Sequence, residues 1–309
     1  MRETPVYLKT TLSGIIIIPM SKNVFSGSDA SRKPDNPQET YSRYYFPGFF
    51  AAEMSCSVIK AANPPHGHYY AVDVTVSNAD KGLLVHVNTE VMKGRGVISA
   101  IKGGFNLSAR GKDKVRTVLE FLENYPILAG DLAKYRITLL KRALLYLESH
   151  GHKSDHTEKT KVMDAIRKIF REIKTKQVVE QSYEIGSVSR HAIGHFLSGV
   201  IDGEGSFGIK AGNSSRGEPY FFIAMKDKKI VQLFSSFIGY GNVRYRNDGV
   251  YHCEVNKLDV LKDMCTLFLE RYPLRHTRQR ERLQKLQRIL NDHTPSPPLL
   301  IFEKSKVGG

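Results

Sequence analysis

Two glutamates that end two similar apolar segments are the residues of this sequence best placed to do chemistry. Glu53 lies in FPGFFAAEMSCSVI, residues 46–59, and Glu204 lies in FLSGVIDGEGSFGI, residues 196–209. Each segment has helical character and carries two small residues four positions apart, on one helix face, where they allow a second helix backbone to approach closely. These small residues are Gly48 and Ala52 in the first segment and Gly199 and Gly203 in the second.

Packing of the two helices along these faces would bring both carboxylates together at helix C-terminal ends. Helix dipoles disfavour negative charge there, so the pair needs a cation. Two close carboxylates suit Mg²⁺, which prefers oxygen ligands and retained waters, and Mg²⁺ suits phosphodiester cleavage. The alternative for each segment alone is an ordinary buried helix with a C-terminal stop. The recurrence of the pattern favours the paired carboxylates.

Charge points to a polyanionic partner. The chain has 309 residues and a net charge of +15, from 46 Lys and Arg against 31 Asp and Glu. A surplus of this size predicts a polyanion, most commonly nucleic acid, although a merely basic soluble protein stays an alternative. The three cysteines, Cys56, Cys253 and Cys265, show no CxxC spacing, which argues against a disulfide framework or a zinc site and for a reducing compartment.

No segment predicts a membrane association. The apolar run from Ile15 to Ile18 is too short to span a bilayer and lacks a signal-peptide cleavage pattern. We therefore expect an intracellular protein, in an organelle such as a mitochondrion or plastid or in a bacterial cytoplasm. Residues 1–40 and 293–309 are predicted to be flexible tails.

The elements around the two segments repeat in the same order. Each helix is followed by strand, strand, helix, strand, strand and helix, which gives αββαββα twice. The sequence LENYPI at 122–127 matches LERYPL at 269–274, in each case between two predicted helices. We therefore predict an α+β protein with a first repeat over 41–149, a linker over 150–190 and a second repeat over 191–292, related by a pseudo-twofold within a monomer.

Each repeat should contain a four-stranded antiparallel sheet with one face against helices and the other face free. Period-two alternation separates apolar from polar side chains along the strands, and the polar sets suit base and phosphate contacts. A solvated sheet face is the alternative reading. The candidate DNA-binding residues are Ser55, Ser57, Asn106, Ser108 and Arg110 in the first repeat, and Ser206, Lys210, Arg244, Arg246 and His252 in the second.

With these features the chain resembles the single-chain, two-repeat LAGLIDADG homing endonucleases. The second motif, LSGVIDGEG at 197–205, is close to the family pattern, whereas the first, FPGFFAAEM at 46–54, departs from it at Pro47, Ala51 and Met54. The resemblance implies that Glu53 and Glu204 bind divalent ions, expected to be Mg²⁺, and that the sheets lie in the major grooves on either side of the cut. It also implies a basic auxiliary residue after the YPL landmark, which only Arg278 supplies.

Two functions follow from the resemblance. The first is site-specific cleavage of double-stranded DNA by an intron-encoded endonuclease. The second is nucleic-acid binding by a catalytically impaired descendant, either an RNA-splicing maturase that would recognise intron RNA or a DNA-binding regulator. The degenerate first motif supports the second function. A structural RNA-associated protein is a weaker third reading, since it depends on charge alone.

Overall fold

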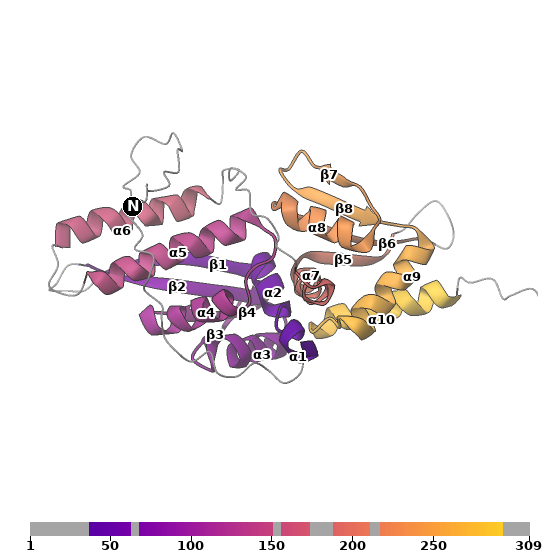
Figure 1. The fold of residues 1–309 in the computed structure, drawn as a ribbon, viewed down its shortest axis with the longest axis horizontal. Coiled ribbons are helices and arrows are strands. Elements are labelled where there is room, and N and C mark those ends of the chain that lie inside the picture. Colours follow the sequence, from indigo (N-terminus) through magenta and orange to yellow (C-terminus); the bar gives the residue numbers. More distant parts are fainter. Residues whose placement is uncertain (1–36, 63–67, 151–155, 174–187, 211–216, 293–309) are drawn as a thin grey trace, which may run out of the picture.

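The computed structural model describes residues 37–62, 68–150, 156–173, 188–210 and 217–292. The predicted tails lie outside these residues, apart from Pro37 to Thr40. Two halves lie side by side, each with a sheet covered by helices (Figure 1). Among the described residues, no helix has the length and apolar character needed to cross a membrane.

The elements of the two halves follow the predicted order. The first half contains α1 (Pro37–Ser42), α2 (Tyr45–Glu53), β1 (Met54–Ala62), β2 (His68–Asn78), α3 (Lys81–Met92), β3 (Val97–Ile101), β4 (Gly104–Arg110), α4 (Lys112–Asn124), α5 (Asp131–Ser149) and α6 (His156–Glu172). The second contains α7 (Arg190–Glu204), β5 (Gly205–Lys210), β6 (Glu218–Met225), α8 (Lys228–Ile238), β7 (Val243–Tyr245), β8 (Tyr251–Val255), α9 (Leu258–Thr266), the π-helical turn η1 (Leu267–Arg271) and α10 (Thr277–Asp292).

Both sheets are antiparallel and have the same topology. Their strand orders are β1-β2-β4-β3 and β5-β6-β8-β7. Alternation explains their burial: Val72, Val74 and Val76 of β2 are fully buried against the helices, together with Leu107 and Ala109 of the neighbouring β4. The intervening side chains lie on the other face, so each sheet has one packed face and one open face. The predicted two-repeat α+β fold is confirmed.

Helix α6 shows that the predicted linker at 150–190 contains a structural element of the first half. Its apolar stripe, which includes Met163 and Phe170, is buried. Lys60 of β1 donates to Asp164 at 2.7 Å, and Arg167 Nε donates to the carbonyl of Val58 at 3.1 Å. An amphipathic stripe of this kind requires an apolar partner surface, and the β1 side of the first sheet supplies it. The remaining linker residues at 151–155 and 174–187 lie outside the described residues.

Helices α2 and α7 join the halves through very close backbone contact. A Cβ added to Gly48 would lie 1.8 Å from the carbonyl oxygen of Phe196, and one added to Gly199 would lie 2.0 Å from the carbonyl oxygen of Tyr45. Near the C-terminal end, a Cβ on Gly203 would lie 2.6 Å from the Cβ of Ala52. The four small residues therefore lie in this interface, where only small side chains fit.

Candidate active site and nucleic-acid interface

Glu53 and Glu204 lie next to each other at the C-terminal ends of α2 and α7. Each helix ends at its glutamate, and the chain passes directly into β1 or β5. A Cβ on Gly203 would lie 3.4 Å from Oε1 of Glu53, so the Glu53 carboxyl reaches the last turn of α7. The close helix packing thus sets two acids side by side, each at the start of a strand whose sheet has an open face.

The ionised forms of the two carboxyls are disfavoured in the metal-free protein. Burial and, to a lesser extent, the charge of Glu204 raise the pKa of Glu53 to about 7, against the lowering effect of a hydrogen bond from Asn78. Burial likewise raises the pKa of Glu204. Within the described part of the chain, neither glutamate has an ion-pair partner. A cation bound between the two carboxyls would stabilise both of them in the ionised form.

The two carboxylates are suitable ligands for one shared Mg²⁺ ion. No group of three or more His, Cys, Asp or Glu side chains among the described residues forms a metal cluster. Mg²⁺ does not require one, because it commonly binds through one or two carboxylates and completes its octahedron with waters and substrate phosphates. Two hard carboxylates beside an open surface meet that requirement, whereas a structural zinc site would need more protein ligands.

The raised pKa of Glu53 predicts a pH dependence of stability in metal-free protein. Because the folded-state pKa is about 7 against an ordinary value of 4.5, the associated stability is present below pH 4.5 and is lost as the pH rises through 7. The loss is roughly 3–4 kcal/mol, since the pKa rises from 4.5 to about 7 and one pKa unit corresponds to about 1.4 kcal/mol. Thermal melts should show that the melting temperature falls between pH 5 and 8, that Mg²⁺ restores it at pH 8, and that Glu53→Gln flattens the profile. Identical profiles for wild type and variant would contradict the assignment.

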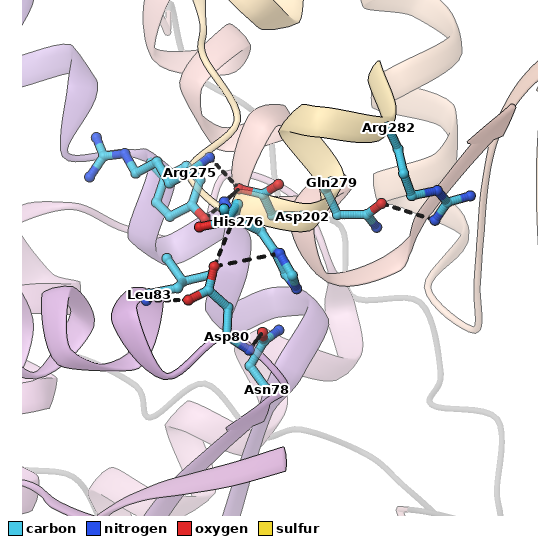
Figure 2. Close-up of polar contacts among 10 residues, drawn as sticks. Asn78, Asp80, Leu83, Asp202, Arg275, His276, Gln279 and Arg282 are labelled. Atoms are coloured by element: carbon cyan, nitrogen blue, oxygen red, sulfur yellow. Dashed lines mark hydrogen bonds and ion pairs between the residues drawn. The ribbon is translucent and has the colours of Figure 1, made fainter. Parts of the chain in front are cut away.

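Asp202 organises the second half of the site and was missed from the sequence. It is buried and lies two residues before Glu204 in α7. Its Oδ2 accepts hydrogen bonds from the Tyr45 hydroxyl at 2.6 Å and from the backbone N–H groups of Arg275 and His276 at 2.7 and 3.0 Å (Figure 2). Burial raises its pKa, and these hydrogen bonds oppose the rise. The carboxylate thus fixes the loop that leads into α10 against both interface helices.

The two halves also exchange helix caps. Asp80 precedes α3 of the first half, and its Oδ2 accepts from the backbone N–H of Thr277 at the start of α10 of the second half, at 2.8 Å (Figure 2). Asp227 precedes α8 of the second half, and its Oδ2 accepts from the backbone N–H of Leu132 at the start of α5 of the first half, at 3.0 Å. Each half therefore satisfies a helix N-terminus of the other, which couples their positions around the paired glutamates.

The basic segment near α10 divides into internal and exposed residues. The guanidinium of Arg275 lies over the rings of Tyr45 and Phe46, with its carbon 4.4 and 4.9 Å from their centroids. Arg282 donates to the carbonyl of Phe207 at 2.8 Å. These two arginines stabilise the fold, whereas Arg278 has an exposed side chain in the first turn of α10. Sequence spacing could not separate these roles.

The strand registers place most of the predicted DNA-binding side chains on the open faces. Cross-strand pairs put Ser55 opposite Thr75, Ser108 opposite Thr75, and Asn106 opposite Ser77 in the first sheet, and Arg244 opposite His252 in the second. By alternation Ser57 and Arg110 lie on the first open face, and Ser206 and Lys210 lie on the second. Arg246 differs, because it follows β7 in a turn and donates to Asp248 at 2.8 Å.

These open faces also contain side chains that the sequence did not single out. Tyr220 and Phe222 of β6 stack with ring centroids 5.6 Å apart, and the ring of His252 lies 4.8 Å from that of Phe222. Two acids, Asp73 and Glu254, lie beside the predicted basic residues, and Glu254 forms an ion pair with Lys210. The sequence did not indicate acids on a surface predicted to bind DNA, because a carboxylate repels phosphate unless a cation pairs with it. The cations that pair with Asp73 and Glu254 are identified only by the structure.

Comparison with known proteins agrees with this arrangement. Residues 197–289 match the LAGLIDADG endonuclease family model. Among solved structures, the LAGLIDADG homing endonuclease I-GzeII in complex with its DNA target aligns with 17% identity and a TM-score of 0.67, covering 81% of this chain and 89% of that one. I-SmaMI bound to uncleaved DNA target in the presence of calcium ions aligns with 18% identity and a TM-score of 0.64, covering 81% and 92%. I-CpaMI bound to uncleaved DNA aligns with 17% identity and a TM-score of 0.60, again covering 81% and 92%. No curated protein sequence matches the chain.

The chain has the two-repeat fold of the LAGLIDADG homing endonucleases, with one acid at the end of each interface helix. The family model covers the second repeat, and the shared fold extends over both halves. The second repeat therefore matches the LAGLIDADG endonuclease family model in sequence, as its motif predicted, and the chain as a whole has the fold of the solved LAGLIDADG homing endonucleases.

Proposed function

We propose that this protein is a site-specific endonuclease that cleaves both strands of duplex DNA with Mg²⁺ held between Glu53 and Glu204. The observation that carries the proposal is the pair of adjacent carboxyls, Glu53 half-buried and Glu204 exposed, without an ion-pair partner in the described chain, at the junction of two sheets with open polar faces. When bound, the ion would activate water and stabilise charge on the phosphate and the leaving oxygen. The relatives that bind DNA targets in crystals share the fold.

The other parts of the site have supporting roles in this proposal. The side chains of the open faces contact bases and fix the register of the duplex. Asn78 orients Glu53 by a hydrogen bond, and Asp202 holds the α10 loop in place. Arg278 contributes positive charge beside the phosphate on one side of the cut, where the first half instead has Asp131 in an ion pair with Lys229 at 3.0 Å. The two strands should therefore be cut at different rates.

A second function, nucleic-acid binding without cleavage, has one specific observation in its favour. The first motif has Ala51 at the position where the second has Asp202. The first half therefore lacks a counterpart of the carboxylate that anchors the α10 loop in the second half. A chain that lost catalysis could still bind duplex DNA as a regulator or intron RNA as a maturase. The presence of the reading frame inside an intron would support intron encoding, and binding to that intron's RNA would support the maturase alternative.

Binding should be monomeric and strongly dependent on salt. Two fused half-sites and a net charge of +15 imply many phosphate contacts, and six to ten such contacts reduce affinity by about 10³-fold or more between 50 and 200 mM salt. Fluorescence anisotropy with a duplex selected from a randomised library measures this slope, and sedimentation of the complex gives its stoichiometry. Affinity that is independent of salt, or binding only as a dimer, would contradict the proposal.

A further inference from the structure

A buried carboxylate organises the open face of the first sheet. Asp73 lies in β2, directly opposite Arg110 of β4, and is only 6% exposed. Its Oδ1 accepts from the Ser108 hydroxyl at 2.8 Å and from Nε of Arg110 at 3.3 Å, and its Oδ2 accepts from the Thr75 hydroxyl at 3.0 Å. All three donors lie on the face that the proposed function assigns to DNA, so one acid fixes the geometry of three neighbouring side chains.

The same contacts fix which groups the surface offers to a ligand. A hydroxyl has one hydrogen, and Ser108 and Thr75 each donate theirs to Asp73, so outward they act as acceptors. The side chain of Arg110 is 60% exposed and donates to Asp73 through Nε, which leaves its two Nη groups as an outward fork. In the described chain, Asp73 is the only hydrogen-bonding partner of this guanidinium. Asp73 thus creates a fork of donors beside two acceptors.

From this geometry we propose that Arg110, positioned by Asp73, recognises a guanine in the half-site that faces the first sheet. A guanidinium fork matches the O6 and N7 acceptors of guanine in the major groove, whereas the acceptors at Ser108 and Thr75 favour neighbouring bases with exocyclic amino groups, namely adenine or cytosine. Asp73 is a positioning residue in this scheme, because it acts on the bases through the side chains that it holds. The proposal depends on the proposed function, since it assumes duplex DNA on this face.

Among the described residues, the second open face has no arginine held by a carboxylate as Arg110 is held by Asp73, since Arg244 on that face has no ion-pair partner. The positioned fork and its guanine preference therefore belong to the first half-site. On the second face the acid Glu254 pairs with Lys210, whose ammonium is a point charge without a planar fork. Nε2 of His252 lies 3.9 Å from Oε2 of Glu254, and the His252 ring packs against the ring of Phe222. A stack of aromatic rings suits apolar contact with bases, including the thymine methyl group, more than it suits bidentate recognition of guanine.

The experiment is selection of binding sites from randomised duplex DNA by the full chain and by three variants. Wild-type protein should yield a site with one strongly preferred guanine in one half. Arg110→Lys should reduce the preference for that guanine by about tenfold or more while keeping the salt dependence of binding, because charge is conserved and the fork is lost. Asp73→Asn should weaken the same position and its neighbours, because an amide can donate to the hydroxyls and free their hydrogens. Arg116→Lys, which changes an arginine paired with Glu148 on the helix layer, is the matched control and should leave the whole site unchanged.

The outcomes separate this inference from the proposed function. An unchanged preference at every position in both Arg110→Lys and Asp73→Asn would overturn the role of the pair, even though wild-type binding to a defined site would still support the endonuclease. Failure of wild-type protein to bind or select duplex DNA would overturn the proposed function itself. Retention of the second half-site preference by each variant shows that it is folded, so a loss confined to the first half-site is a loss of recognition.

Discussion

Glu204→Gln should lower the rate of DNA cleavage by at least about 10³-fold and leave the affinity for the selected duplex nearly unchanged. The substitution removes a hard anionic ligand for the divalent ion, which is worth several kcal/mol in the transition state, and each 1.4 kcal/mol is a factor of ten in rate. It keeps the shape of the side chain and therefore the packing of α2 against α7. Because burial already raises the pKa of Glu204, a neutral amide should not weaken the metal-free fold.

Glu53→Gln should have the same effect if both acids hold one metal centre. Glu120→Gln is the matched control, because Glu120 is an exposed glutamate on α4, away from the interface helices. Single-turnover cleavage and anisotropy measured on the same preparations separate the chemical step from binding. Full double-strand cleavage by the Glu204→Gln protein would show that the catalytic centre lies elsewhere, and full activity of Glu53→Gln alone would assign the ion to the second half only.

Gly199→Ala should strongly destabilise the protein, although it adds only a methyl group. Its Cβ would lie 2.0 Å from the carbonyl oxygen of Tyr45 and 2.6 Å from the backbone nitrogen of Phe49, and neither backbone atom can move without separating the two halves. Overpacking of a core costs about 1–3 kcal/mol, and a backbone clash in the central interface should reach or exceed the upper end of that range. Chemical denaturation followed by circular dichroism measures the loss.

Gly82→Ala is the control for this prediction. Gly82 lies in α3, and a Cβ there would meet only Oδ1 of Asp80, at 3.2 Å. Alanine has the better helix propensity, so this variant should be neutral or more stable by up to about 1 kcal/mol. Equal stabilities for the two variants would show that α2 and α7 do not pack as closely as their glycines indicate.

The sequence predicted helices and strands best where the spacing of apolar residues matches the burial of those residues in the structure. Helix α3 (Lys81–Met92) lies where the repeated element order predicts a helix between two pairs of strands, because its apolar spacing and the glycine-containing turn after it are both local signals. Strand β4 likewise alternates as predicted, with Leu107 and Ala109 buried and Asn106 and Ser108 on the open face. The recurring glycines indicated a helix pair because a close approach of backbones demands small residues on both helices.

Long-range polar contacts could not be predicted in the same way. The exchange of caps by Asp80 and Asp227 joins residues nearly 200 and 100 positions apart, and Asp80 has the ordinary appearance of a cap for its own helix. Asp202 lies in the same motif as Glu204 and was not singled out as a functional residue. The sequence does show that the first motif has Ala51 at the corresponding position. The role of Asp73 depends on the register of β2 against β4, which a sequence alone does not fix.

The differences between the halves have a common physical consequence. The second half has Asp202 and, in the first turn of α10, an exposed Arg278, whereas the first half has Ala51 and a paired Asp131. In our proposal Arg278 of the second half supplies positive charge near the phosphate, whereas the corresponding loop of the first half carries Asp131 and is held by Asp227 from the opposite half. An enzyme built in this way should cut one strand first and pass through a nicked intermediate.

The central claim is tested most directly by the products formed from a supercoiled plasmid that carries the selected site. Wild-type protein at a concentration that saturates binding is incubated with Mg²⁺, and a parallel reaction contains chelator in place of Mg²⁺. We predict a transient nicked circle followed by full conversion to one linear product with Mg²⁺, and intact supercoiled plasmid with chelator. Supercoiled plasmid that stays intact in Mg²⁺ while its site is occupied would contradict the account and would establish a DNA-binding protein without nuclease activity.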